Sequence, residues 1–132
     1  MSDPNELQKL QREWFQFGEG DLVGAKILSN AKGSSNTIGL LLQQAIEKYL
    51  KGYLLGHGWE LVKTHNIEFL LAEAARFNEN FTAFYDFGRA VTALYAEDRY
   101  PIRHQEEVSN ELLKQMIEVG ERLIGLVLKS TE

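Results

Sequence analysis

The sequence predicts an all-α fold, an up-and-down antiparallel bundle of four long helices plus one short helix. Apolar residues recur with the helical period in five segments. Strand signals are weak, because valine and isoleucine do not alternate with polar residues. The 132 residues include only two prolines, Pro4 and Pro101, and no internal repeat or long linker. We therefore expect a single domain over residues 1–132, with its core at about 14–129 and antiparallel neighbouring helices.

The first expected helix has apolar residues at helical spacing and ends before the loop at residues 31–35. Its apolar positions are Trp14, Phe17, Leu22, Ala25 and Leu28. The stretch from Gly18 to Gly24 resembles a dinucleotide-binding fingerprint, but it is one residue too long and no strand precedes it. We therefore interpret Gly20 and Gly24 as positions of close packing between helices.

The strongest helical pattern runs from Ile38 to Leu54 and forms one broad apolar stripe. The stripe consists of Ile38, Leu41, Leu42, Ala45, Ile46, Tyr49, Leu50, Tyr53 and Leu54. Five polar residues fall off it: Gln43, Gln44, Glu47, Lys48 and Lys51. Ser34, Ser35 or Asn36 can cap the start of this helix, and Gly56 and Gly58 offer left-handed positions at its end.

Three further helices follow the same logic. The short third helix is outlined by Ile67, Leu70, Leu71, Ala74 and Ala75, with Thr64 or Asn66 as its cap. The fourth is outlined by Phe84, Phe87, Val91, Leu94 and Tyr95. The fifth is outlined by Val108, Leu112, Met116, Val119, Leu123 and Val127. Because the fifth helix and the stretch 77–87 are apolar on more than one side, we expect a surface for self-association.

Composition and charge exclude several classes of function. Without cysteine, the chain has no disulfide, zinc–thiolate site, iron–sulfur cluster or thiol nucleophile. No HExxH motif occurs and no glutamate lies three residues before a histidine, so no metal and no cofactor is expected. The formal net charge of −5 argues against non-specific binding of nucleic acid. With no targeting signal and no membrane-length apolar run, the sequence predicts a cytoplasmic protein that does not enter a membrane.

One pattern in the sequence can carry chemistry. Arg99 and His104 lie directly after the fourth expected helix, and Pro101 between them disfavours an unbroken helix. A turn here can bring the two side chains together. An imidazole moves protons near neutral pH and a guanidinium holds a phosphate, a combination that would support metal-independent RNA cleavage. The alternative, which spacing alone favours, is that Arg99 pairs with Glu97 or Asp98 and His104 is a solvated loop residue.

Several segments together form a more specific pattern. They are Gln43–Leu55, Gly58, Thr64–Ile67, Leu70–Leu71 and Arg99–Pro101, with Asp21, Leu22 and Ala25 on the first helix. This combination resembles the HEPN domain (higher eukaryotes and prokaryotes nucleotide-binding) from roughly Trp14 to Lys129.

The resemblance implies an all-helical homodimer that works on nucleotides or RNA. It also implies a partner, a separately encoded minimal nucleotidyltransferase, with which many bacterial members form toxin–antitoxin-like pairs. Catalytic members use an Arg-x4–6-His motif, which corresponds here to Arg99 and His104. A metal-independent endoribonuclease is therefore the alternative function. The paired toxins often carry a tyrosine two residues after the histidine, where this chain has Glu106.

Five further residues are candidates for binding: Asp21, Lys48, Lys51, His65 and Arg103. Asp21 is either a polar residue near the site or a buried carboxylate with a partner. His65 follows Thr64 as in family members, and we expect it to hold a turn rather than to act in catalysis. Lys48 and Lys51 belong either to a basic face or to an ordinary solvated one. Four aromatic residues either stack on bases or belong to the core: Trp14, Tyr49, Tyr53 and Trp59.

Overall fold

The computed structural model describes residues 3–98 and 108–132, without the side chains of residues 94–98. Within these ranges it contains five α-helices, one 3₁₀ helix and no strand. The elements are α1 (Pro4–Asn30), α2 (Ser35–Gly56), α3 (Ile67–Ala75), the 3₁₀ helix η1 (Glu79–Phe84), α4 (Tyr85–Asp98) and α5 (Asn110–Ser130). The predicted all-α bundle of four long helices and one short helix is confirmed.

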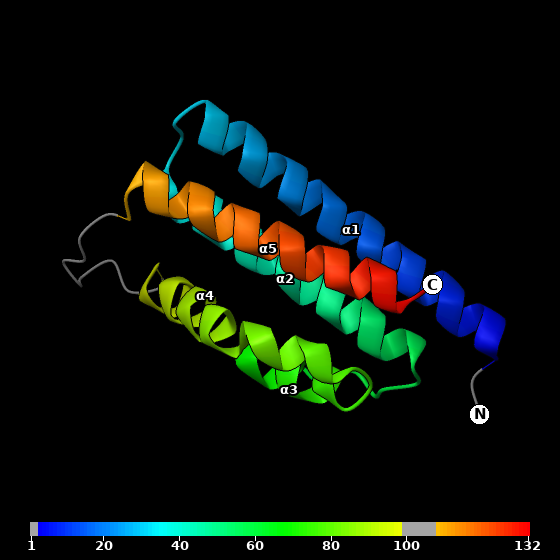
Figure 1. Cartoon of the computed structure of the whole chain (residues 1–132). Coiled ribbons are helices and arrows are strands. Elements are labelled where there is room, and N and C mark those ends of the chain that lie inside the picture. The colour runs from blue at the N-terminus through cyan, green and yellow to red at the C-terminus, as the bar shows by residue number, and fades with distance from the viewer. Residues whose placement is uncertain (1–2, 99–107) are drawn as a thin grey trace.

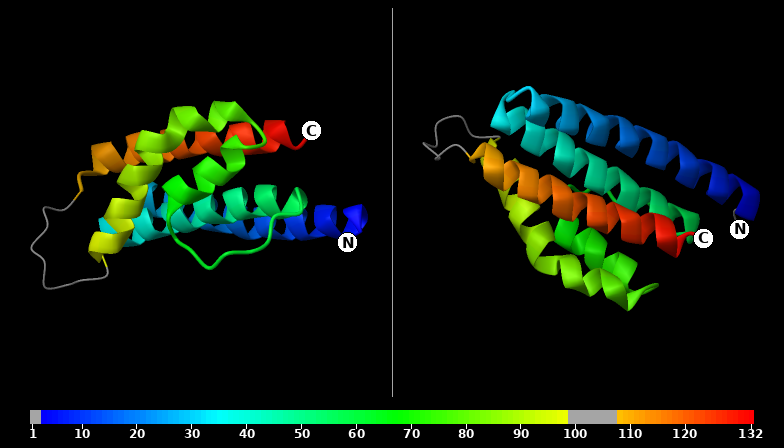
Figure 2. Two further views of the ribbon diagram at one scale, coloured as in Figure 1. Left: turned by 90° about the horizontal axis from the view of Figure 1, so that it is seen from below. Right: turned by 45° about the horizontal axis from the view of Figure 1, so that its top comes forward.

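Helix α2 is the centre of the bundle (Figure 1). Helix α1 packs antiparallel along it, α5 covers a second side, and α3 and α4 cover a third. Figure 2 shows that the segment after α2 runs back along the bundle before α3 begins, so α3 starts beside the middle of α2. Helices α1 and α5 contact each other much less than each contacts α2. Helices α1 and α5 are therefore attached to the bundle mainly through α2, whereas α4 and η1 contact α3 more than α2.

This central position buries α2 on more sides than its apolar stripe predicts. Gln43, Glu47 and Lys51 are only 1%, 9% and 6% exposed, although all three fall off the apolar stripe. The residues are spaced i, i+4, i+8, so they form a second, polar stripe along one face of the helix. The start of α3 and the segment before it cover this polar stripe. A solvated position for Lys51 is thus wrong, because this side chain is buried and paired with Glu47.

The ends of the helices carry most of the predicted caps. The side chains of Ser34 and Asn66 each accept a hydrogen bond from the amide three residues further on, which satisfies a free N–H group in the first turns of α2 and α3. At the other end of α2, Gly58 has a left-handed φ of +84°. Gly56, the other glycine predicted there, remains within the helix.

On α1, close packing against α2 requires a glycine at Gly18, not at Gly20. A Cβ atom at Gly18 would lie 2.8 Å from the ring of Tyr49, whereas a Cβ at Gly20 would meet nothing within 4 Å. At Gly24 the nearest atom would be 3.5 Å away, an ordinary contact with Leu41. The expectation for Gly20 is therefore wrong, and Gly24 is not a tight approach either. Helical spacing places Gly18 on the buried face with Leu22, while Gly20 faces outward.

These positions give a matched pair of alanine substitutions in one helix. Gly18→Ala forces the buried Tyr49 ring to move, and we expect it to lower the free energy of unfolding by about 1–2 kcal/mol, because overpacking outweighs the gain in helix propensity. Gly20→Ala gains propensity without a clash and should raise the free energy of unfolding by about 0.5–1 kcal/mol. Urea unfolding of the two variants measures both changes, and equal effects would contradict the packing described.

Candidate functional site

The three predicted residues of the Arg-x4-His segment, Arg99, Arg103 and His104, lie outside the described residues. Helix α4 is described as far as Asp98, and α5 begins at Asn110. Both of these helix ends lie at the same end of the bundle as the turn between α1 and α2 (Figure 1). The two described helices that precede and follow residues 99–107 in the sequence therefore meet that gap at the same end of the bundle.

A polar pocket of about 440 Å³ lies at this end of the bundle. It is lined by residues 32–35, in the turn before α2, and by residues 108–110, at the start of α5. The N-termini of α2 and α5, capped by Ser34 and Ser109, therefore border the same pocket. Lys32, which has a left-handed φ of 55°, adds a positive charge. Helix N-termini and a lysine attract anions, so the chemistry of this pocket suits a phosphate group.

Asp21 and Lys48, two predicted binding residues, meet across the α1–α2 interface. Lys48 Nζ lies 2.5 Å from Asp21 Oδ2, and both side chains are partly buried. Close by, the hydroxyl of Tyr49 donates a hydrogen bond of 2.9 Å to Glu19. Burial, and then this carboxylate, raise the pKa of Tyr49 well above its usual range. Of the two alternatives for Asp21, the structure shows a carboxylate with a partner on the neighbouring helix.

Lys51 and His65, two further candidates, share the carboxylate of Glu47. Lys51 Nζ lies 2.9 Å from Glu47 Oε2, and His65 Nδ1 lies 2.8 Å from Glu47 Oε1. One turn earlier, Gln43 donates a 2.7 Å hydrogen bond to the backbone carbonyl of His65. The predicted role of His65 in holding a turn therefore has a structural basis, because both its ring and its backbone are held to α2. We call Gln43, Glu47, Lys51 and His65 the α2 polar cluster.

Sequence reasoning missed Glu47 and Gln43 as members of this cluster. The sequence does contain an indication of the cluster. Gln43, Glu47 and Lys51 are spaced i, i+4, i+8, which places three polar side chains in one row along the helix. Such a row is usually solvated on an amphipathic helix. Only the three-dimensional arrangement shows that His65 closes over it.

The aromatic residues proposed for base stacking belong largely to the core. Tyr49 and Tyr53 are buried, and the Trp59 ring nitrogen donates a 3.2 Å hydrogen bond to Glu73. His57 packs its ring against Tyr53 and Phe77, with ring centroids 4.5 and 4.3 Å away. This burial lowers the pKa of His57, although one edge of the residue remains exposed. Of the two interpretations of these aromatic residues, base stacking or a place in the core, the second is therefore correct for Tyr49 and Tyr53.

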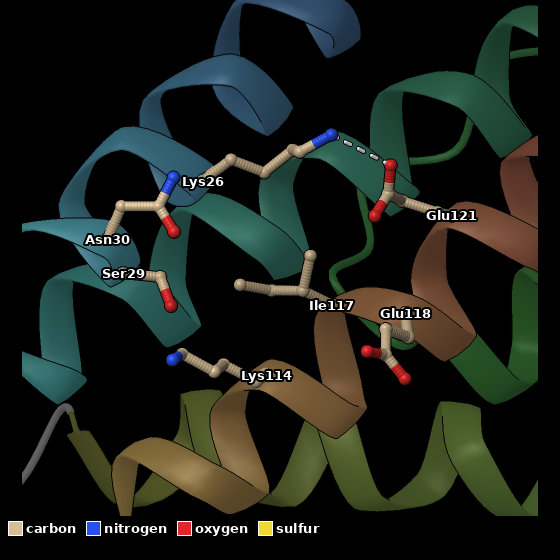
Figure 3. A pocket seen from close by; sticks show the side chains of 7 residues that line it. All are labelled: Lys26, Ser29, Asn30, Lys114, Ile117, Glu118 and Glu121. Carbon is tan, nitrogen blue, oxygen red and sulfur yellow. Dashed lines mark hydrogen bonds and ion pairs between the residues drawn. The ribbon is translucent and has the colours of Figure 1, made fainter.

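A second cavity, of about 270 Å³, lies between the C-terminal half of α1 and the N-terminal half of α5 (Figure 3). Lys26 and Glu121 form a 3.0 Å ion pair between the two helices. The side chain of Lys114 extends toward Ser29, and Ile117 lies between the two helices. Because two lysines and two glutamates line it, this cavity favours neither an anion nor a cation.

Among the side chains that the structure describes, no group of three His, Asp or Glu residues is placed to hold a metal ion. The same residues include no helix that is both long and apolar enough to cross a bilayer.

Comparison with known proteins identifies the fold. The sequence matches the HEPN domain family over residues 11–130. No curated protein matches the chain. The crystal structure of TT1696 from Thermus thermophilus is similar, with a TM-score of 0.77 and 21% sequence identity over 91% of this chain and 97% of that chain. At this identity the likeness supports the fold alone. Because the family match spans most of the sequence, this chain belongs to the HEPN domain family.

Proposed function

We propose that this HEPN domain binds nucleotides or RNA as a homodimer and works beside a separately encoded minimal nucleotidyltransferase, in a toxin–antitoxin-like pair. The observation that carries the proposal is the family match over residues 11–130. In this proposal the nucleotidyltransferase is a different chain, and the HEPN domain occupies residues 11–130 of this one. The HEPN domain would bind the nucleotide, or bind the molecule to which the nucleotidyltransferase transfers it.

The electrostatics of the described residues favour binding at one place rather than over the whole surface. The net charge is −5, and three lysines of α1 and α2 are each paired with a carboxylate: Lys26, Lys48 and Lys51. By contrast, the polar pocket of residues 32–35 and 108–110 combines Lys32 with two helix N-termini. This combination of charges supports nucleic-acid binding at the end of the bundle that holds the N-termini of α2 and α5.

The second candidate function is a metal-independent endoribonuclease. The observation that favours it is the Arg-x4-His spacing, which starts at the residue after the described end of α4. In this proposal His104 accepts the proton of a ribose 2′-hydroxyl as that oxygen attacks the adjacent phosphorus. The bond from phosphorus to the 5′-oxygen of the next nucleotide breaks, which gives a 2′,3′-cyclic phosphate and a 5′-hydroxyl that takes its proton from water. Arg99 stabilises the negative charge that develops on the phosphate oxygens. A dimer would bring two copies of this pair toward one cleft.

The proposed partnership predicts a stable complex between two gene products. We expect the neighbouring gene to encode a small nucleotidyltransferase with a Gly-Ser motif and paired aspartates. When both chains are co-expressed and only the nucleotidyltransferase carries an affinity tag, this chain should co-purify with it in a fixed ratio. A neighbouring gene of another class, or a tagged nucleotidyltransferase that retains none of this chain, would contradict the partnership.

Cleavage is tested with purified protein, RNA and a metal chelator. If Arg99 and His104 are catalytic, His104→Ala and Arg99→Ala should each slow cleavage by about 100-fold or more. Arg89→Ala is the matched control, because this α4 arginine is already held by Glu68 at 2.6 Å and Asp86 at 3.3 Å. We expect Arg89→Ala to cleave at the wild-type rate.

Measuring RNA binding by fluorescence anisotropy on the same variants separates the two functions. If the wild-type protein binds RNA and leaves it intact, the ribonuclease activity is excluded and the proposed binding function stands. Equal cleavage by all variants would exclude Arg99 and His104 as the catalytic pair. Wild-type protein that neither binds RNA or nucleotides nor cleaves would contradict both functions.

A further inference from the structure

The cavity between α1 and α5, which we call the α1–α5 cavity, is lined by a buried hydroxyl that has no partner. Ser29 is only 6% exposed, and its side chain makes no hydrogen bond to any other residue that the structure describes. Figure 3 shows this side chain on the wall of the cavity, with the side chain of Lys114 extended toward it. A hydroxyl removed from water without a partner is unfavourable, because it loses the hydrogen bonds that water would supply. A polar group that enters the cavity can therefore restore a hydrogen bond that the folded chain leaves unmade.

The α1–α5 cavity carries no net charge, but one charge of each sign is free to meet a ligand. Lys26 and Glu121 hold each other in an ion pair of 3.0 Å. Lys114 and Glu118 are exposed and form no ion pair with the residues that the structure describes. They are four residues apart on α5, which separates them by about 6 Å along the helix axis. A ligand that satisfies both must carry an anionic group at one point and a hydrogen-bond donor at another.

Donors and acceptors in the cavity lie on opposite sides of Ile117 (Figure 3). Ser29, Asn30 and Lys114 lie on one side, and all three can donate hydrogen bonds. Glu118 lies on the other side, and its carboxylate accepts them. The Ile117 side chain between them is apolar and 6% exposed. The lining thus has a side that suits an anion, an apolar middle and a side that accepts hydrogen bonds.

A ribose phosphate matches this order of groups. Its phosphate accepts hydrogen bonds and complements the charge of Lys114. Its 2′-hydroxyl can donate to a carboxylate, the contact by which acidic residues bind the ribose of a dinucleotide. An α-amino acid fits less well, because its two charged groups share one carbon atom and cannot lie on both sides of Ile117. The volume of about 270 Å³ is below the usual range for drug-sized ligands, so the cavity suits the ribose phosphate and leaves the base outside.

The α1–α5 cavity follows directly on the polar pocket of residues 32–35 and 108–110. Asn30 precedes the turn that lines this pocket, and Lys114 lies about one helical turn after Asn110. Both sites therefore lie in the part of the bundle where α1 ends and α5 begins. An RNA strand with one phosphate in the polar pocket can place a neighbouring ribose phosphate in the cavity.

We propose that the α1–α5 cavity binds the ribose phosphate group of a ribonucleotide. The phosphate accepts hydrogen bonds from Lys114, Ser29 and Asn30, and the 2′-hydroxyl donates one to Glu118. This inference rests on the proposed function, nucleotide or RNA binding, and assigns it a subsite. The ribonucleotide is either a free one or one within an RNA strand, because both carry the same ribose phosphate.

The phosphate side is tested by titrating the four ribonucleoside 5′-monophosphates into the protein in a calorimeter. Lys114→Gln removes the free positive charge and should weaken binding by about 10-fold or more. Ser29→Ala removes the buried hydroxyl and should weaken binding by about 5-fold. Lys129→Gln is the matched control, because Lys129 is an exposed lysine in the last turn of the same helix, and it should bind like the wild type.

The ribose side is tested by comparing each ribonucleotide with its 2′-deoxy form. The wild type should bind the ribonucleotide about 10-fold more tightly, because the deoxy form leaves Glu118 without its donor. Glu118→Ala should reduce this preference to less than about 2-fold. The ratio of the two affinities is the measurement, since removing a negative charge strengthens phosphate binding in both cases.

Repeating the titrations with a short RNA, and with DNA of the same sequence, identifies the source of the ribose phosphate. If mononucleotides bind and Lys114→Gln weakens them alone, the ligand is a free ribonucleotide. If Lys114→Gln weakens RNA binding and mononucleotides do not bind, the ligand is a nucleotide within a strand.

The outcomes separate this inference from the proposed function. Wild-type affinity of both Lys114→Gln and Ser29→Ala, for mononucleotides and for RNA, would overturn the subsite and leave nucleic-acid binding standing. Equal binding of ribonucleotides and their deoxy forms by the wild type would overturn the contact between Glu118 and the ribose. A wild-type chain that binds neither mononucleotides nor RNA would overturn the subsite and the proposed function together.

Discussion

The carboxylate of Glu47 lies in an almost enclosed position on the central helix, where Lys51 and His65 both reach it. A carboxylate so removed from water is stable in its charged form only when paired and hydrogen-bonded. The chain meets this requirement with a lysine one turn away and with the segment that leads into α3. The lysine thus balances the charge, while Glu47 and Gln43 hold the ring and the backbone carbonyl of His65 against α2. Because α3 follows this segment directly, the α2 polar cluster sets where α3, and after it α4, begins.

The central position of α2 also explains the outer surface of the molecule. Helices α1, α5 and the α3–α4 pair each attach to α2 and make fewer contacts with one another. A helix attached along one side alone has an opposite side without a neighbour, and on α1 that side carries Phe17 and Ile27 rather than charged residues. The architecture that encloses α2 thus leaves an apolar face on α1. At one end of the bundle, a polar pocket lies between the turn that joins α1 to α2 and the start of α5.

Helical spacing was sufficient to predict the five α-helices that the structure describes, because the apolar residues of an amphipathic helix recur on its buried side. It did not predict the 3₁₀ helix η1. It was not sufficient to predict burial around α2, since Gln43, Glu47 and Lys51 look like a solvated row unless the covering segment is known. The contrast between Gly18 and Gly20 has the same origin: both glycines are equally compatible with a helix, and only the position of Tyr49 separates them. The pairing of Asp21 with Lys48 likewise depends on how two helices align. Arg99, Arg103 and His104 lie outside the described residues, so their roles stay predictions from sequence and family membership.

The most direct test of this account is the unfolding free energy of charge variants in the α2 polar cluster. Lys51→Met should lower it by about 3 kcal/mol, because Glu47 loses a partner in a buried position. The double variant Glu47→Gln with Lys51→Met removes both charges and should recover a large part of that loss. Lys26→Met, which breaks the exposed pair with Glu121, should change it by less than about 1 kcal/mol. If Lys51→Met cost no more than Lys26→Met, the buried charge of Glu47 could not be what organises the bundle.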